Sequence, residues 1–102
     1  MHARLDLVES AIESALTTFA IGMKSLWFDG KQDAYAVAYH AQLDLEDTLK
    51  SLIPCREGRA YMKVYKSLEN AWNYAKNSKT DEVARSRAWL FYKLALKHAN
   101  NV

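Results

Sequence analysis

Hydrophobic residues recur at three- and four-residue steps in four separate stretches of this chain, and that spacing constrains the fold more than any other feature. In the first stretch they are Leu5, Val8, Ile12, Ala15, Leu16, Phe19, Met23, Leu26 and Trp27. Such spacing places them on one face of an α-helix, which has about 3.6 residues per turn. Three glycines and one proline in 102 residues are too few for the many turns of a β-sandwich. The sequence therefore predicts an all-α fold.

Turn residues and the single proline divide the chain into four predicted helices. Asp29-Gly30 ends the first helix, because glycine tolerates the left-handed conformation found at helix ends. Asp33 is expected to cap the second helix, and Pro54 disfavours helical geometry at Ile53, which sets the boundary there.

The second half of the chain repeats this plan. The third helix is expected to start near Glu57, and residues 77–80 form the turn that follows it. Ser78 or Thr80 is the expected cap of a last helix over residues 81–99.

The predicted inward faces of these three helices are again apolar lines at helical spacing. They comprise Ala34, Val37, Ala38, Ala41, Leu45, Leu49 and Leu52 in the second helix, Tyr61, Val64, Tyr65, Leu68, Ala71, Trp72 and Ala75 in the third, and Val83, Ala84, Ala88, Leu90, Phe91, Leu94, Ala95 and His98 in the fourth.

Charge is divided unevenly between the two halves. Residues 1–53 carry four basic and eight acidic side chains, a net charge of −4, whereas residues 54–102 carry ten basic and four acidic side chains, a net charge of +6. A chain of this length is expected to form one domain, here spanning residues 1–102. We therefore predict four helices arranged as two similar helical hairpins, an acidic hairpin over 1–53 and a basic hairpin over 54–102.

An internal duplication is one explanation of the two hairpins. A shift of 48 residues places Lys31-Gln32-Asp33 on Lys79-Thr80-Asp81 and Ala36 on Ala84. The same shift places five apolar residues of the first helix on apolar residues of the third, namely Ile12, Leu16, Ala20, Met23 and Trp27 on Ala60, Val64, Leu68, Ala71 and Ala75. The alternative is an unrelated four-helix bundle, and both give an all-α domain.

Few residues of the chain could carry metal or nucleophile chemistry. His40 and Asp44 share a helix face, but two ligands do not complete a metal site. Cys55 lies beside basic residues that lower a thiol pKa, yet no histidine is close to it in sequence. We expect no enzyme activity, no metal and no cofactor.

The sequence also bears on cellular location. It shows no secretory signal and no apolar run approaching the roughly 20 residues that span a bilayer, and its lone cysteine excludes an intramolecular disulfide. An intracellular protein without a membrane partner is expected.

Aromatic residues are numerous for so small a chain. Residues 89–92 are four consecutive large apolar side chains, so at least one must face away from a single core. Exposed clustered aromatics mark protein interfaces. We predict a protein–protein interaction module whose groove between the hairpins is lined by aromatic anchors and receives a partner segment; the candidate anchors are Trp27, Tyr35, Tyr39, Trp72 and Trp89. The alternative is burial of all of them in the core.

A basic ridge supports a second functional hypothesis. Arg56, Arg59, Lys63 and Lys66 step by three and four residues and so lie on one helix face, where they could bind nucleic-acid phosphates. Trp72 or Tyr74 could then stack on a base. The opposite charge of the two halves could also drive head-to-tail contact between copies.

The doubled helical plan around Lys31-Gln32-Asp33 and Lys79-Thr80-Asp81, with tyrosine- and tryptophan-rich helices and no enzyme signature, resembles the small orphan proteins of filamentous viruses that infect hyperthermophilic archaea. The resemblance implies an accessory or interaction role, in the host cytoplasm if the protein is viral. It implies no particular functional residues.

Overall fold

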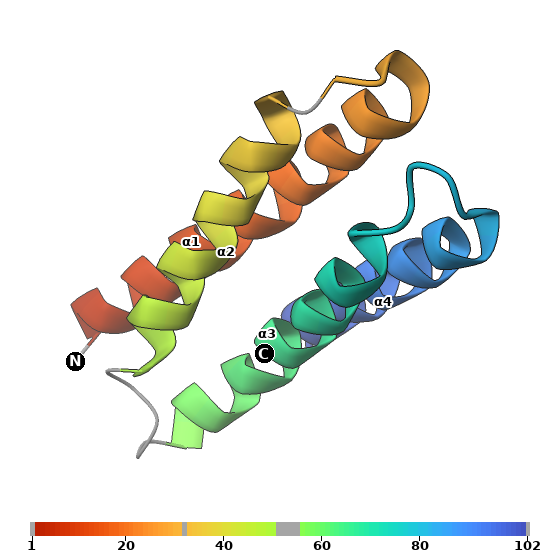
Figure 1. Ribbon diagram of the computed structural model, residues 1–102. Helices are drawn as coiled ribbons and strands as arrows, with labels where there is room; N and C mark the ends of the chain where they lie inside the picture. Colours follow the sequence, from red (N-terminus) through yellow and green to blue (C-terminus); the bar gives the residue numbers. More distant parts are fainter. Residues whose placement is uncertain (1, 32, 51–55, 102) are drawn as a thin grey trace.

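Four helices are arranged as two antiparallel hairpins that lie side by side, with both hairpin turns at the same end of the molecule (Figure 1). The computed structural model describes residues 2–31, 33–50 and 56–101, and the side chains of residues 7–31, 33–50 and 61–101. The helices are α1 (His2–Lys24), α2 (Asp33–Lys50), α3 (Arg56–Ala75) and α4 (Glu82–Asn100), and a π-helical turn, η1 (Ser25–Asp29), continues α1. The predicted all-α fold with two helical hairpins is confirmed.

The two helices of each hairpin differ in how many other helices surround them. α1 packs on α2, α3 and α4, and α3 packs on α1, α2 and α4. α2 and α4 lie diagonally opposite, and across the described residues they do not pack on each other. The molecule is elongated, with extents of 43 × 22 × 18 Å.

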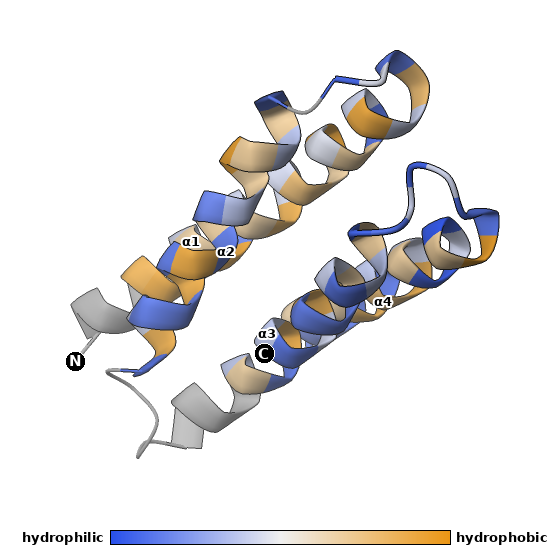
Figure 2. Ribbon diagram, in the orientation of Figure 1, coloured by the Kyte–Doolittle hydropathy of each residue, from blue (hydrophilic) through white to orange (hydrophobic). Residues whose placement is uncertain are grey.

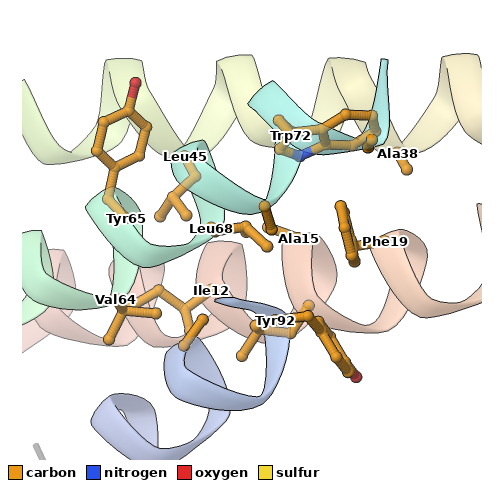
Figure 3. Packing of buried hydrophobic residues seen from close by; sticks show 14 of the residues in the cluster. Ile12, Ala15, Phe19, Ala38, Leu45, Val64, Tyr65, Leu68, Trp72 and Tyr92 are labelled. Atoms are coloured by element: carbon orange, nitrogen blue, oxygen red, sulfur yellow. The ribbon is translucent and has the colours of Figure 1, made fainter. Parts of the chain in front are cut away.

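The core lies between the hairpins and is built largely from α1 and α3. Every side chain of the predicted inward face of α3 is buried, and so are those of α1 and η1 from Val8 to Leu26. Phe19 of α1 lies between Trp72 of α3 and Tyr92 of α4 (Figure 3). Burying one large apolar side chain contributes roughly 1.5–3 kcal/mol, so this shared core is what holds the hairpins together.

The predicted inward faces of α2 and α4 are partly wrong. Val37, Val83, Leu90 and Leu94 are exposed, whereas two residues outside those predictions, Gln42 and Tyr92, are buried. The reason is the diagonal placement: a helix with two neighbours buries a narrower stripe than a helix with three. Leu90 is the member of the run 89–92 that points most fully outward.

The turns also differ in detail from expectation. Gly30 does adopt the left-handed conformation, with φ of 67°. Asp33 is the first residue of α2 rather than a cap before it. The cap of α4 is Asp81, not Ser78 or Thr80: its carboxylate accepts hydrogen bonds from the backbone N–H groups of Val83 and Ala84. The α3–α4 turn is mostly hydrophilic (Figure 2).

Five residues of the sequence predictions lie outside the described part of the chain. They are Gln32, Leu52, Ile53, Pro54 and Cys55, and the side chains of Leu5, Arg56, Arg59 and Ala60 are likewise outside it.

The pattern of buried residues in the first hairpin recurs in the second, but it aligns at shifts of 49 and 50 residues and not at the predicted shift of 48. Ile12, Phe19 and Met23 correspond in burial to Tyr61, Leu68 and Trp72, a shift of 49, and Ala38 and Leu45 correspond to Ala88 and Ala95, a shift of 50. Under the shift of 48, exposed Ala36 is paired with buried Ala84. The hairpins thus share a plan, while a duplication stays an interpretation.

Candidate functional site

The five predicted aromatic anchors form two groups at the seam between the hairpins. Tyr35 and Tyr39 of α2 meet Trp72 edge to face, with ring centroids 5.0 and 5.7 Å from that of Trp72. Trp27 of η1 meets Trp89 of α4 at 5.7 Å.

Two core rings join these groups. Phe19 lies 5.0 Å from Trp72 and 5.3 Å from Tyr92, and Tyr92 lies 4.8 Å from Trp89. A continuous series of aromatic contacts therefore crosses the molecule from α2 to α4, and Figure 3 shows its central members.

The five anchors differ in accessibility. Trp72 is only 4 % exposed, so it is a core residue rather than a surface that a partner can contact. Tyr39 is 44 % exposed, and Trp27, Tyr35 and Trp89 are half-buried. Burial raises the pKa of Tyr35, helped by the nearby Tyr39, and burial also raises the pKa of Tyr92. Both rings therefore stay neutral well above physiological pH.

Trp27 is fixed in place by the opposite hairpin. Its indole Nε1–H donates to the hydroxyl of Ser78 at 2.8 Å, and that hydroxyl donates to the carbonyl of Ala75 at 2.7 Å. The guanidinium of Arg85 lies 5.4 Å from the centre of the Trp27 ring. It also donates from Nε to the carbonyl of Ser78 at 3.3 Å and from Nη2 to that of Lys79 at 3.4 Å. The cation and the indole are thus held together by the α3–α4 turn.

The π-helical turn η1, which follows α1, determines how Trp27 and Phe28 are placed. π-helical turns are rare and occur frequently at functional sites. Here the wider turn ends at Gly30, whose backbone N–H donates to the carbonyl of Ser25. It leaves Phe28 78 % exposed beside the half-buried Trp27.

A cavity opens at this end of the molecule between α1–η1 and α4. It has a volume of about 450 Å³, and its walls include Trp27, Phe28 and Trp89 together with the cations Lys24 and Arg85. We call it the tryptophan cleft.

A second hollow lies further along the same two helices. It has a volume of about 330 Å³ and is lined by apolar residues of α1 and α4, by the rings of Tyr61 and Tyr92, and by Glu9 and Glu13. The phenol of Tyr61 donates to Glu9 Oε1 at 3.1 Å. The described linings of the two hollows share no residue, and the contact between the rings of Trp89 in the cleft and Tyr92 in the second hollow places the two hollows next to each other along α4. We call the pair the α1–α4 groove; it is basic at the tryptophan end and acidic at the other.

Trp27 and Trp89 were predicted as anchors, and both line the tryptophan cleft, whereas Phe28, Ser78 and Arg85 were not among the predicted anchors. Phe28 was visible as a neighbour of Trp27, but nothing in the sequence indicated which of the two would be covered. Ser78 and Arg85 lie more than fifty residues from Trp27, so only the packing of the hairpins reveals their roles.

The basic ridge is partly outside the described side chains. Lys63 and Lys66 are exposed on α3, as the ridge requires. The suggested base-stacking role of Trp72 is wrong, because that ring is buried. Tyr74 stacks on Phe91 at 5.7 Å and lies under the guanidinium of Arg87. Nucleic-acid binding stays a prediction.

Of the residues considered for catalysis or metal binding, His40 and Asp44 are described, and Cys55 lies outside the described residues. His40 and Asp44 are exposed on α2, and neither lines any of the cavities described above. Among the residues whose positions are described, no three His, Cys, Asp or Glu side chains are grouped as a metal ion would need.

Comparison of the chain with protein-family models, with curated protein sequences and with solved structures finds no match. The resemblance to viral proteins therefore stays a prediction. Within the described part of the chain, no helix has the length and apolar character needed to cross a membrane.

Proposed function

We propose that the protein is a non-enzymatic interaction module whose α1–α4 groove binds an apolar segment of a partner protein. One observation carries the proposal: Trp27 and Trp89, from different hairpins, line the same cavity beside a phenylalanine that is 78 % exposed. Aromatic side chains at concave surfaces are the usual anchors of protein recognition.

The fixed position of Trp27 favours binding. Ordering a flexible side chain on binding costs roughly 0.5–1.5 kcal/mol, and a side chain already held in place avoids most of that cost. The hydrogen bond to Ser78 and the stacked Arg85 hold the indole before any partner arrives.

The charges at the two ends of the groove specify the partner segment further. Lys24 and Arg85 border the tryptophan cleft, and Glu9 and Glu13 border the other hollow. Opposite charges across an interface fix its orientation. The segment is expected to be apolar in its middle, acidic at the end that lies on the tryptophans and basic at the other end.

Selection from a displayed peptide library tests this function. Peptides that bind the wild-type protein are synthesised, and their affinities are measured for Trp89→Ala and Phe28→Ala, with circular dichroism confirming that each variant is folded. Removing an aromatic anchor at the centre of an interface weakens binding by about tenfold or more. Val37→Ala is the matched control, because Val37 is 60 % exposed but lies on α2, away from the groove.

Two outcomes overturn the proposal. One is a selection that yields no specific binder to the wild-type protein. The other is a set of peptides that bind Trp89→Ala and Phe28→Ala as tightly as the wild type.

A further inference from the structure

The outer surface of α4 carries an apolar and basic stripe that no described part of the chain covers. Val83, Arg87, Leu90, Leu94 and Lys97 follow one another at alternating four- and three-residue steps, which places them on one line along the helix. Val83 is 59 %, Leu90 63 % and Leu94 38 % exposed. We call this line the α4 stripe, and exposed Lys93 lies beside it.

The outer surface of α2 carries the opposite charge. Val37 is 60 % and Leu43 38 % exposed, and because they are six residues apart they lie about 120° from each other around the helix, with the exposed Asp33, Asp44 and Asp47 between them. Lys50 at its end forms an ion pair with Glu46 at 3.6 Å. We call this surface the α2 stripe.

The exposed charged residues of the two helices give them opposite net charges. On α2 they are three acids and one base, Asp33, Asp44, Asp47 and Lys50, and on α4 they are one acid and three bases, Glu82, Arg87, Lys93 and Lys97. Because α2 and α4 lie diagonally opposite, the two stripes of one molecule cannot meet each other. We propose that copies of this chain associate head to tail, with the α4 stripe of one copy packed on the α2 stripe of the next.

An antiparallel register brings apolar and oppositely charged groups to similar heights along the two helices. With Leu43 level with Leu90, Val37 falls within one helical turn of Leu94 along the axis. The same register brings Lys50 within a turn of Glu82, Asp47 within a turn of Arg87, and Asp33 within a turn of Lys97. The parallel register with the same leucine pair instead places Lys50 opposite Lys97 and Asp33 near Glu82. Like charges in contact are destabilising, so the antiparallel register is favoured.

The geometry makes this interface heterologous, because two different surfaces meet. A heterologous contact leaves one free stripe at each end of every dimer, so association continues into a ring or an open chain. A single helix pair covers less than the roughly 800 Å² per partner of a stable interface, so the association is weak and depends on concentration.

Sedimentation velocity of the wild-type chain and two charge variants tests the proposal. Leu90→Asp blocks the α4 stripe and Val37→Asp blocks the α2 stripe, and both residues are exposed, so the fold is retained. The wild-type protein is expected to grow beyond a dimer with rising concentration at low salt. Each variant alone is expected to stay monomeric, and an equimolar mixture of the two is expected to form a one-to-one dimer and nothing larger, through its one intact pair of stripes.

Salt and a matched variant complete the test. Raising the ionic strength from about 0.05 to 0.5 M shortens the screening length several-fold, and association is expected to weaken by about tenfold or more. Leu7→Asp is the control, because Leu7 is a leucine on α1 that is 64 % exposed and lies outside both stripes. It is expected to associate like the wild type.

Three results overturn the proposal. A wild-type chain that remains monomeric at millimolar concentration and low salt has no such interface. A Val37→Asp variant that still associates shows that the α4 stripe pairs with itself or that another surface is used. A mixture of the two variants that stays monomeric shows that the stripes do not bind each other.

Discussion

Ser78 joins the two hairpins through one hydroxyl group. The group is fully buried, accepts a hydrogen bond from Trp27 and donates one to the carbonyl of Ala75. Ser78→Ala leaves the indole N–H without its acceptor, and we expect the free energy of unfolding to fall by about 1–2 kcal/mol in urea titrations. A double-mutant cycle with Trp27→Phe separates the contribution of the Trp27–Ser78 hydrogen bond from that of the hydrogen bond between Ser78 and Ala75. Strictly additive effects of the two substitutions would show that the bond contributes nothing.

Tyr65 makes stability depend on alkaline pH. Burial raises its pKa above the usual value near 10, and the hydrogen bond that its phenol donates to Glu69 at 2.9 Å raises the pKa further. A raised pKa in the folded state means that the neutral form stabilises the fold. This stabilisation is complete below the pKa of the unfolded chain and is lost as the pH rises above it.

We therefore expect the urea midpoint of the wild type to fall as the pH rises from about 9.5 to 11.5. The urea midpoint of Tyr65→Phe should fall less steeply over the same range, because phenylalanine has no hydroxyl group to ionise. The slope should not vanish, since burial also raises the pKa of Tyr35 and Tyr92. Parallel curves for the two proteins would contradict the prediction.

Gln42 is a polar residue in an apolar position. Its side chain is 5 % exposed, and among the described residues neither its amide nitrogen nor its amide oxygen has a hydrogen-bond partner. A buried unpaired polar group costs about 1–3 kcal/mol, so Gln42→Met, which keeps the length of the side chain, should raise the free energy of unfolding by about 1 kcal/mol. Gln42→Ala is the contrasting variant, because it leaves a cavity and should not stabilise. A less stable Gln42→Met would mean that the amide is satisfied in solution.

At the scale of the helices, Gly22 sets how closely α1 and α2 approach. A Cβ atom at this position would lie 3.0 Å from the carbonyl oxygen of Ala34 and 3.1 Å from the Cα of Tyr35, and both are backbone atoms that cannot turn aside. Alanine stabilises a helix by about 1 kcal/mol relative to glycine, but moving two packed helices apart costs more free energy than this gain.

We expect Gly22→Ala to lower the free energy of unfolding by about 1–2 kcal/mol in thermal or urea unfolding, because crowding outweighs the helix preference. Thr17→Ala is the control: it changes an exposed residue of the same helix and should leave stability within about 0.5 kcal/mol. A stabilised Gly22→Ala would show that the two helices separate readily.

The same scale explains what the sequence could predict. The apolar faces of α1 and α3 were predicted correctly because each of these helices is surrounded by three others, so nearly every apolar residue at the right spacing is covered. On α2 and α4 the spacing is equally regular, but two neighbouring helices cover only part of each apolar face, and Val37 and Leu90 remain exposed to solvent. Periodicity identifies a face; it does not reveal how many helices cover that face.

The sequence predicted the candidate site only in part, for the same reason. Trp27 and Trp89 were predicted as anchors because they are aromatic residues near a hairpin seam, and their role as anchors stays a prediction. Their exposure, and the burial of Trp72, depend on the register between hairpins, which no local pattern fixes. The acidic hollow was missed because Glu9 and Tyr61 meet only after the hairpins have docked.

At the scale of the whole molecule, the hairpins depend on each other. Phe19, Trp72 and Tyr92 come from three helices and both hairpins, and the ring of Phe19 contacts each of the other two rings. A hairpin alone would expose these rings to water. We therefore expect one cooperative unfolding transition, with tryptophan fluorescence and far-ultraviolet circular dichroism giving the same midpoint.

Two phenylalanines test whether this shared core, rather than aromatic content, holds the molecule together. Phe19 is fully buried and Phe28 is 78 % exposed, so the substitutions Phe19→Ala and Phe28→Ala remove the same atoms from opposite environments. Phe19→Ala leaves a cavity at the junction of the hairpins and should cost about 3–5 kcal/mol, a large part of the 5–15 kcal/mol typical of a small domain. Phe28→Ala should cost less than about 0.5 kcal/mol, because its ring is already in water. Both values come from urea unfolding followed by the two probes. If Phe19→Ala splits the transition into two, or costs no more than Phe28→Ala, the hairpins are independent units and the α1–α4 groove between them is not a fixed surface.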